Sequence, residues 1–135
     1  MACPWFYPLE RLGAARSIMP LGDAWEGECR APGGESAALD RRRVLECCNM
    51  GYARGKCPRF PGNGGPDAVR FAVASHRDGF VRLSCVLEKD FLPFGRAALA
   101  WDLEGRRFTA PHADPRIDRQ AWAYVSSYLL RKQFP

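Results

Sequence analysis

The stretch AVRFAVASHRDGFVRLSCVL, residues 68–87, contains two runs rich in β-branched and aromatic residues on either side of an Asp-Gly pair. Such residues favour strands, and Asp-Gly between two strand-like runs favours a tight hairpin turn. We therefore predict strands over 68–75 and 80–87, joined by a turn at 76–79. This hairpin indicates an antiparallel sheet as the basis of the fold.

The chain after this hairpin continues the strand pattern. The segment 93–95, Pro-Phe-Gly, is expected to break the chain, and a third strand is predicted over 96–103. A turn at 104–106 then leads into a short fourth strand over 107–110. The result is an antiparallel β-meander of three to four strands.

A C-terminal helix is predicted to begin at Asp114-Pro115, because Asp is a favoured N-cap and Pro suits the first helical position. Arg131 and Lys132 suit its last turn, where cations complement the negative end of the helix dipole. The helix carries an apolar stripe, so we expect it to pack on one face of the sheet. The stripe consists of Ile117, Ala121, Tyr124, Val125, Tyr128 and Leu129.

The first half of the chain is rich in cysteine and in loop-forming residues, and two helices are expected in it. Residues 9–18 are predicted to form a short helix that ends at Pro20. A second helix is predicted from Ser36, as its N-cap, through Cys48, with Gly51 as its stop.

The Gly- and Pro-rich segment 62–66 divides the chain into two parts of one predicted domain, residues 1–135. Residues 1–61 form a Cys-rich, metal-binding half of loops and helix. Residues 67–135 form the sheet and the C-terminal helix packed on it. We therefore predict an α+β fold.

The formal net charge is +5, and Arg supplies 17 of the 20 basic residues. These arginines are spread along the chain, whereas a nucleic-acid binder usually gathers its charge on one face or arm. The composition therefore disfavours a nucleic-acid partner. The sequence has no apolar run that could span a bilayer and no signal-peptide pattern at its start. We expect a cytoplasmic protein with reduced thiols and no membrane partner.

Five of the six cysteines lie within the first 57 residues. Disulfides are rare in a reducing cytosol, so clustered thiols point to a bound metal or to redox chemistry. Neighbours on a helix point about 100° apart, so Cys47 and Cys48 are not expected to ligate one centre together. The preferred ligand set is Cys3, Cys29, Cys48 and Cys57, with Cys47 as the alternative to Cys48.

The spacing of these cysteines favours an iron–sulfur cluster over zinc. Structural zinc sites usually take ligands from pairs roughly two to four residues apart, and this chain has no Cys-x-x-Cys pair. A [4Fe–4S] cluster is larger, and widely separated cysteines can reach its four corners. Arg30, Arg54, Lys56 and Arg59 would suit its net negative charge. We therefore expect a [4Fe–4S] cluster, with Zn²⁺ on the same cysteines as the alternative.

The Cys47-Cys48 pair and the later segment 57–61, Cys-Pro-Arg-Phe-Pro, resemble the signature of a family of small bacterial cysteine-cluster proteins. That signature contains a Cys-x-x-Cys-Cys element and a later Cys-x-x-Phe-Pro. This chain has Val44-Leu45-Glu46 where the first cysteine of the element would stand. The resemblance implies a zinc- or iron–sulfur-binding protein.

Three functional hypotheses follow. The first is a small cytoplasmic metal-binding protein, with a structural or electron-transfer role and a redox or protein partner. The second is an interaction module whose sheet and C-terminal helix bind protein or RNA, either stabilised by zinc on the same cysteines or without any metal. If the protein is exported, the cysteines would instead form disulfides. The third is a thiol-dependent enzyme, with Cys57 as nucleophile and His76 or His112 as base. Cys85, alone in a predicted strand, is expected to be a buried apolar residue.

Overall fold

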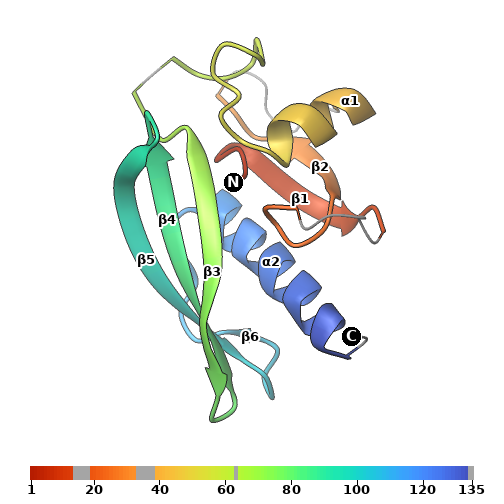
Figure 1. Ribbon diagram of the computed structural model, residues 1–135, viewed down its shortest axis with the longest axis vertical. Coiled ribbons are helices and arrows are strands. Elements are labelled where there is room, and N and C mark those ends of the chain that lie inside the picture. The colour runs from red at the N-terminus through yellow and green to blue at the C-terminus, as the bar shows by residue number, and fades with distance from the viewer. Residues whose placement is uncertain (14–18, 33–38, 63, 134–135) are drawn as a thin grey trace.

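The computed structural model describes residues 1–13, 19–32, 39–62 and 64–133, and it contains two antiparallel sheets and a long C-terminal helix (Figure 1). The predicted α+β fold is confirmed. The elements are, in chain order, β1 (Phe6–Arg11), β2 (Trp25–Cys29), α1 (Arg41–Arg43), the π-helical turn η1 (Val44–Cys48), β3 (Ala68–Arg77), β4 (Phe80–Lys89), β5 (Leu92–Asp102), β6 (Arg107–Phe108) and α2 (Pro115–Gln133).

The larger sheet is a meander in which β3, β4, β5 and β6 pair in that order, each pair antiparallel. Arg77 pairs with Phe80 across a two-residue turn, in which Asp78 and Gly79 have φ values of 56° and 82°. Positive φ at both central residues defines the type I′ turn, whose twist matches that of the flanking strands. The predicted hairpin is confirmed.

The chain break predicted at 93–95 is wrong, because this segment lies inside β5. The chain instead reverses at Asp90 and Phe91, which have φ values of 51° and 64°, and Lys89 pairs with Leu92. A proline is tolerated here because it is the second residue of the strand and lies next to a register shift in the pairing with β4. The last strand, β6, is shorter than predicted.

Helix α2 begins where the sequence predicts. The Asp114 Oδ1 accepts the backbone N–H of Arg116 at 2.9 Å, which is the bond of an N-cap. Tyr124 stacks on Phe71 of β3, with ring centroids 5.6 Å apart. Figure 1 shows α2 running across one face of the large sheet, with β1 and β2 on its other side. Within the described ranges, no helix combines the length and the hydropathy needed to cross a membrane.

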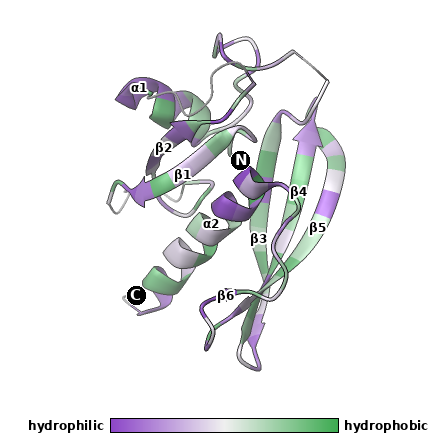
Figure 2. Cartoon of the chain, turned by 180° about the vertical axis from the view of Figure 1, so that it is seen from behind, coloured by the Kyte–Doolittle hydropathy of each residue, from purple (hydrophilic) through white to green (hydrophobic). Residues whose placement is uncertain are grey.

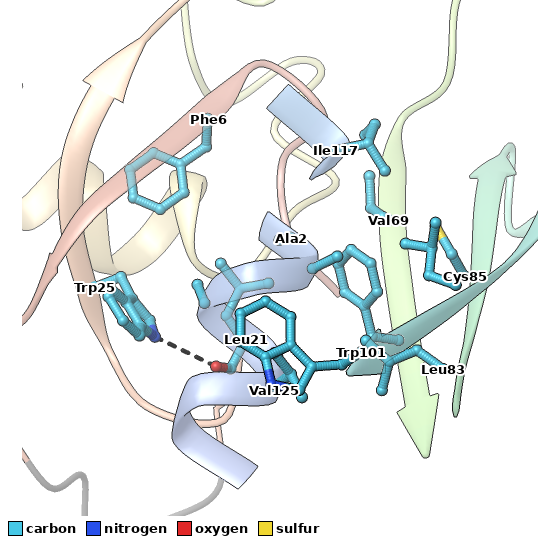
Figure 3. Close-up of a cluster of buried hydrophobic side chains, with 14 of the residues drawn as sticks. Ala2, Phe6, Leu21, Trp25, Val69, Leu83, Cys85, Trp101, Ile117 and Val125 are labelled. Atoms are coloured by element: carbon cyan, nitrogen blue, oxygen red, sulfur yellow. Dashed lines mark hydrogen bonds between the residues drawn. The ribbon is translucent and has the colours of Figure 1, made fainter. Parts of the chain in front are cut away.

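The hydrophobic core lies between α2, the large sheet and the β1–β2 sheet (Figure 3). The Trp25 Nε1–H donates to the Leu21 carbonyl at 3.3 Å, so this buried indole has a partner. Cys85 of β4 is 1% exposed and belongs to this core, as expected for an apolar thiol. The core includes Phe6, Leu21, Trp25, Val69, Leu83, Trp101, Ile117 and Val125.

The short helix predicted over 9–18 is wrong where the structure describes it. Residues 9–11 belong to β1, which pairs antiparallel with β2, and residues 14–18 lie outside the described residues. Phe6 and Pro8 are buried while Tyr7 between them is partly exposed. This alternation is that of a strand with one buried face.

The helix predicted from Ser36 to Cys48 is present only in its second part. Ser36 lies outside the described residues, and the observed N-cap is Asp40, whose Oδ1 accepts the Arg43 N–H at 2.9 Å. The chain then changes from α1 into the π-helical η1 and turns at Gly51, the predicted stop, with φ of 71°. Figure 2 shows α1 as strongly hydrophilic, in keeping with its three arginines.

Candidate metal centre

Five cysteines from four segments of the chain line one small cavity of about 20 Å³. Such a volume holds roughly one water molecule, so the thiols nearly fill the space between them. Cys3 precedes β1, Cys29 ends β2, Cys47 and Cys48 lie in η1, and Cys57 lies in the loop that follows. The fold therefore brings together all four residues of the preferred ligand set and the alternative ligand.

The segment of Cys3 is joined directly to the end of η1. The Cys3 N–H donates to the Cys48 carbonyl at 2.9 Å, and Ala2 and Val69 of β3 exchange two backbone hydrogen bonds of 2.8 Å. A Cβ at Gly51 would lie 3.0 Å from the carbonyl oxygens of Met1 and Ala2. Glycine is therefore needed here for close backbone approach as well as for its positive φ.

A buried asparagine fixes the π-helical turn that carries Cys47 and Cys48. The Asn49 N–H donates to the Val44 carbonyl at 3.0 Å, five residues back, which closes the wide turn. Its side-chain Nδ2 donates to the carbonyls of Val44 and Trp25, and its Oδ1 accepts the Trp25 N–H, at 2.8–2.9 Å. Asn49 thus ties η1 to β2, and sequence reasoning missed it because its partners lie on another element.

Both cysteines of η1 line the cavity, although helical geometry led us to expect only one of them at a common centre. Cys48 also belongs to the hydrophobic core. Cys47 also lines a shallower hollow on the outer side of η1, together with Arg43, Glu46 and Lys56. The choice of Cys48 over Cys47 as ligand stays a prediction.

The loop that carries Cys57 is held against the large sheet. The Tyr52 hydroxyl donates to Glu88 Oε1 at 2.6 Å, and the Arg54 guanidinium lies 3.4 Å from the Asp67 carboxylate. Within the loop, the Cys57 N–H donates to the Ala53 carbonyl at 2.8 Å. Cys57 is partly exposed, whereas the other five cysteines are buried.

Burial and the neighbouring thiols raise the pKa of Cys3, Cys47 and Cys48 in the absence of a cation. Burial raises the pKa of Cys3 to about 12, and the neighbouring Cys29, Cys57 and Cys47 add to the rise. Burial likewise raises the pKa of Cys48, which is close to the same cysteines. A bound metal would displace these protons and compensate the negative charge of the thiolates.

Two residues in the wall of the cavity each carry a buried side-chain N–H donor that has no hydrogen-bond partner among the described residues. These donors are the Trp5 Nε1 and the Arg59 Nη1. A buried donor without a partner destabilises the folded protein, so an acceptor bound in the cavity would stabilise the site. Thiolate or inorganic sulfide in the cavity is an acceptor of the required charge, and neither residue was assigned this role from the sequence.

In the parts of the chain that the structure describes, no group of three or more His, Cys, Asp or Glu side chains is arranged to hold a metal ion. The five thiols share a cavity lined otherwise by apolar residues and Arg59, with no carboxylate in its wall. The donor set available there is therefore entirely sulfur, which selects soft or borderline metals.

The two histidines considered as catalytic bases are engaged elsewhere. The His76 Nδ1 lies 2.8 Å from the Tyr128 hydroxyl at the far end of β3. The His112 Nδ1 accepts the Asp114 N–H at 2.9 Å, just before α2. Neither belongs to the wall of the cysteine cavity.

The chain was compared with models of protein families, with curated proteins and with solved structures, and no match was found in any of the three.

Proposed function

We propose that this protein binds a [4Fe–4S] cluster through Cys3, Cys29, Cys48 and Cys57, with Cys47 as the alternative to Cys48. The observation that carries the proposal is the gathering of five thiols from four segments of the chain around one cavity. The preferred ligands are 26, 19 and 9 residues apart, obtained as 29 − 3, 48 − 29 and 57 − 48. Widely separated ligands of this kind suit the four corners of a cluster.

The surroundings of the cavity support an anionic centre. A [4Fe–4S] cluster with four thiolate ligands is negatively charged, and N–H donors to its sulfur atoms tune it. The unpartnered Nε1 of Trp5 and Nη1 of Arg59 are such donors. Apolar residues around the same cavity, among them Phe6 and Phe60, would exclude water.

The proposed role is structural, electron-transferring or both. A centre held by Cys3, Cys29, Cys48 and Cys57 would join four segments of the loop-rich half, so its binding energy would become folding energy. Electron exchange with a redox or protein partner would take place at the partly exposed Cys57. A cytoplasmic location would keep the thiols reduced until the cluster is loaded.

The test is anaerobic purification followed by measurement of iron, acid-labile sulfide, zinc and the visible spectrum. A brown protein with about four irons and four sulfides per chain would support the proposal. Cys29→Ser and Cys57→Ser are expected to lose the cluster and much of the soluble protein. Cys85→Ser is the matched control, since it also alters a buried cysteine but lies outside the cavity. A soluble Cys57→Ser protein with full iron content would contradict the ligand set.

Zinc is the second candidate, because a single ion needs less room than a cluster and the cavity has a volume of only about 20 Å³. The same four cysteines would then form a closed tetrahedral site that stabilises an interaction module. One zinc per chain in a colourless protein would favour this function over the cluster.

A further inference from the structure

A second, more open groove shares no lining residue with the cysteine cavity. It lies where β1, the end of β5, β6 and the first turns of α2 meet, and its volume is about 480 Å³. This volume is in the range of sites that hold small molecules. Its wall contains four aromatic rings, three guanidinium groups and one carboxylate.

The charge of the groove favours an anion. Arg106, Arg107 and Arg119 face a single carboxylate, Asp118, whose Oδ1 accepts the His112 N–H at 2.8 Å. Within the described ranges, neither Arg106 nor Arg107 makes an ion pair. Two cations are therefore available to a ligand, and planar guanidinium groups suit phosphate oxygens.

Arg119 is held in place before any ligand arrives. Its Nε donates to the Pro8 carbonyl at 2.7 Å and its Nη2 to the Leu9 carbonyl at 3.2 Å. Its guanidinium carbon lies 3.8 Å from the centre of the Trp122 ring. The cation is thus pre-organised on an aromatic face, and little side-chain entropy remains to be lost on binding.

The aromatic side chains of the wall offer a flat group the ring surface that Arg30 on Tyr7 and Arg119 on Trp122 leave uncovered. Trp101 and Phe108 pack edge to face with centroids 5.0 Å apart, and Tyr7 and Trp122 complete the aromatic part of the wall. Aromatic rings combined with arginines form the typical site for a heterocyclic base joined to a phosphate. An inorganic anion alone would use only the arginines.

We propose that this groove binds a nucleotide-type anion, in which a planar heterocyclic base is joined to phosphate, either as a free nucleotide or as a unit of a single strand. The arginines are spread along the chain, but the fold brings Arg106, Arg107 and Arg119 to one groove. The proposal is independent of the metal centre.

The proposal is tested on the full chain with three probes: AMP, a fluorescent short oligothymidylate and inorganic phosphate. Binding is measured at low and moderate salt by calorimetry and fluorescence anisotropy. AMP and the oligothymidylate are expected to bind, and phosphate is expected to bind more weakly. If the oligothymidylate binds much more tightly than AMP, the ligand is a unit of a single strand. If the two affinities per base are similar, the ligand is a free nucleotide.

The variant Arg106→Asn/Arg107→Gln removes both available cations, and Asn tolerates the φ of 54° at position 106. We expect its affinity to fall about tenfold or more, and its salt dependence to fall by about one unit of slope per arginine removed. Arg96→Gln is the control, since Arg96 is exposed on β5 five residues before Trp101 and therefore on the other face of the strand. Unchanged affinity in the double variant, no binding of either base-containing probe, or phosphate binding as tightly as AMP would each overturn the proposal.

Discussion

The side-chain amide of Gln120, buried in the second turn of α2, donates to the carbonyl of Cys3 at 2.7 Å. Its Nε2 also donates to the Phe6 carbonyl at 2.8 Å. Helix α2 therefore holds two backbone carbonyls in the turn that leads into β1. One of them belongs to Cys3, the first candidate ligand.

Gln120→Ala is expected to lower the free energy of unfolding by roughly 1–3 kcal/mol, because it removes two buried hydrogen bonds and leaves the Cys3 carbonyl with only the Phe6 N–H as donor. It should also lower the metal content of the purified protein, since the Cys3 segment loses its support. Chemical denaturation and metal analysis check both effects. Gln133→Ala, at the exposed end of the same helix, is the control. Equal stability of the two variants would contradict the role given to Gln120.

Asn49→Ala removes three side-chain hydrogen bonds, of which two join η1 to Trp25 of β2 and one closes η1 onto Val44. We expect a loss of about 3 kcal/mol in the free energy of unfolding, since each buried partner left unpaired costs free energy. Met50→Ala, one residue further on and half exposed, should cost far less. Hydrogen exchange of the η1 amides measures the local effect, and unchanged protection in Asn49→Ala would rule out the anchoring role.

Gly51→Ala places a Cβ 3.0 Å from two backbone carbonyls at a residue with φ of 71°. We expect destabilisation of about 2 kcal/mol or more, because the strained φ and the contact add together. Gly62→Ala is a matched control, because nothing lies within 4 Å of its added Cβ and its φ is ordinary. Thermal unfolding compares the two. Similar melting temperatures would show that the first residues do not pack on Gly51 as described.

The N-cap of α2 predicts an acid-side dependence of stability. Partial burial alone would raise the pKa of the Asp114 carboxyl, but hydrogen bonds from the Arg116 side chain and backbone outweigh it and lower the pKa. Because the pKa of this carboxyl is lower in the folded protein than in the unfolded chain, the carboxylate stabilises the fold at pH values above its unfolded-state pKa. The stabilisation is lost as the pH falls through the folded-state pKa. Asp114→Ala should cost about 1 kcal/mol at neutral pH.

Asp114→Asn is the companion variant, because Asn caps helices without ionising. It should keep most of the neutral-pH stability and lose the part of the pH dependence that Asp114 supplies. Denaturation midpoints from neutral pH down to below pH 3 check this. If Asp114→Asn shows the same acid-side slope as the unaltered protein, the carboxylate does not contribute it.

Cys57 should be the first cysteine to react with iodoacetamide in metal-free, folded protein. It is partly exposed, whereas the other cysteines are buried and burial raises the pKa of Cys3 and Cys85, to about 12 and about 11. A thiol reacts as the thiolate, so a raised pKa and burial both slow the reaction. Peptide mass spectrometry over time gives the order, and bound metal should protect Cys57. Early modification of Cys85 would contradict the core described here.

Local signals in the sequence predicted the parts of the fold that depend on neighbouring residues. Asp78-Gly79 favours the positive φ values of a tight hairpin turn. Asp114-Pro115 favours a helix start through local geometry alone. Pro93 was misleading because pairing with β4 tolerates a proline near the start of a strand. Residues 9–11 were assigned to a helix because their partner, β2, is distant in sequence and short apolar runs are ambiguous.

The sequence allowed the cysteines of the candidate site to be predicted, but not the buried polar side chains that hold their backbone in place. Clustered cysteines are visible in any sequence, and the structure places five of them around one cavity. Asn49 and Gln120 could not be recognised, because a polar residue shows its role only when its tertiary partners are known. The groove around Arg119 is likewise formed by segments more than ninety residues apart, from Tyr7 to Phe108.

The hydrogen bond from Gln120 to Cys3 also bears on the order of events during synthesis. Cys3 is synthesised more than a hundred residues before the side chain that holds its carbonyl. A centre ligated by Cys3, as proposed, would therefore be completed only after α2 has been synthesised and has docked. Its loading would follow the folding of both halves and would not take place on the nascent cysteine-rich half alone.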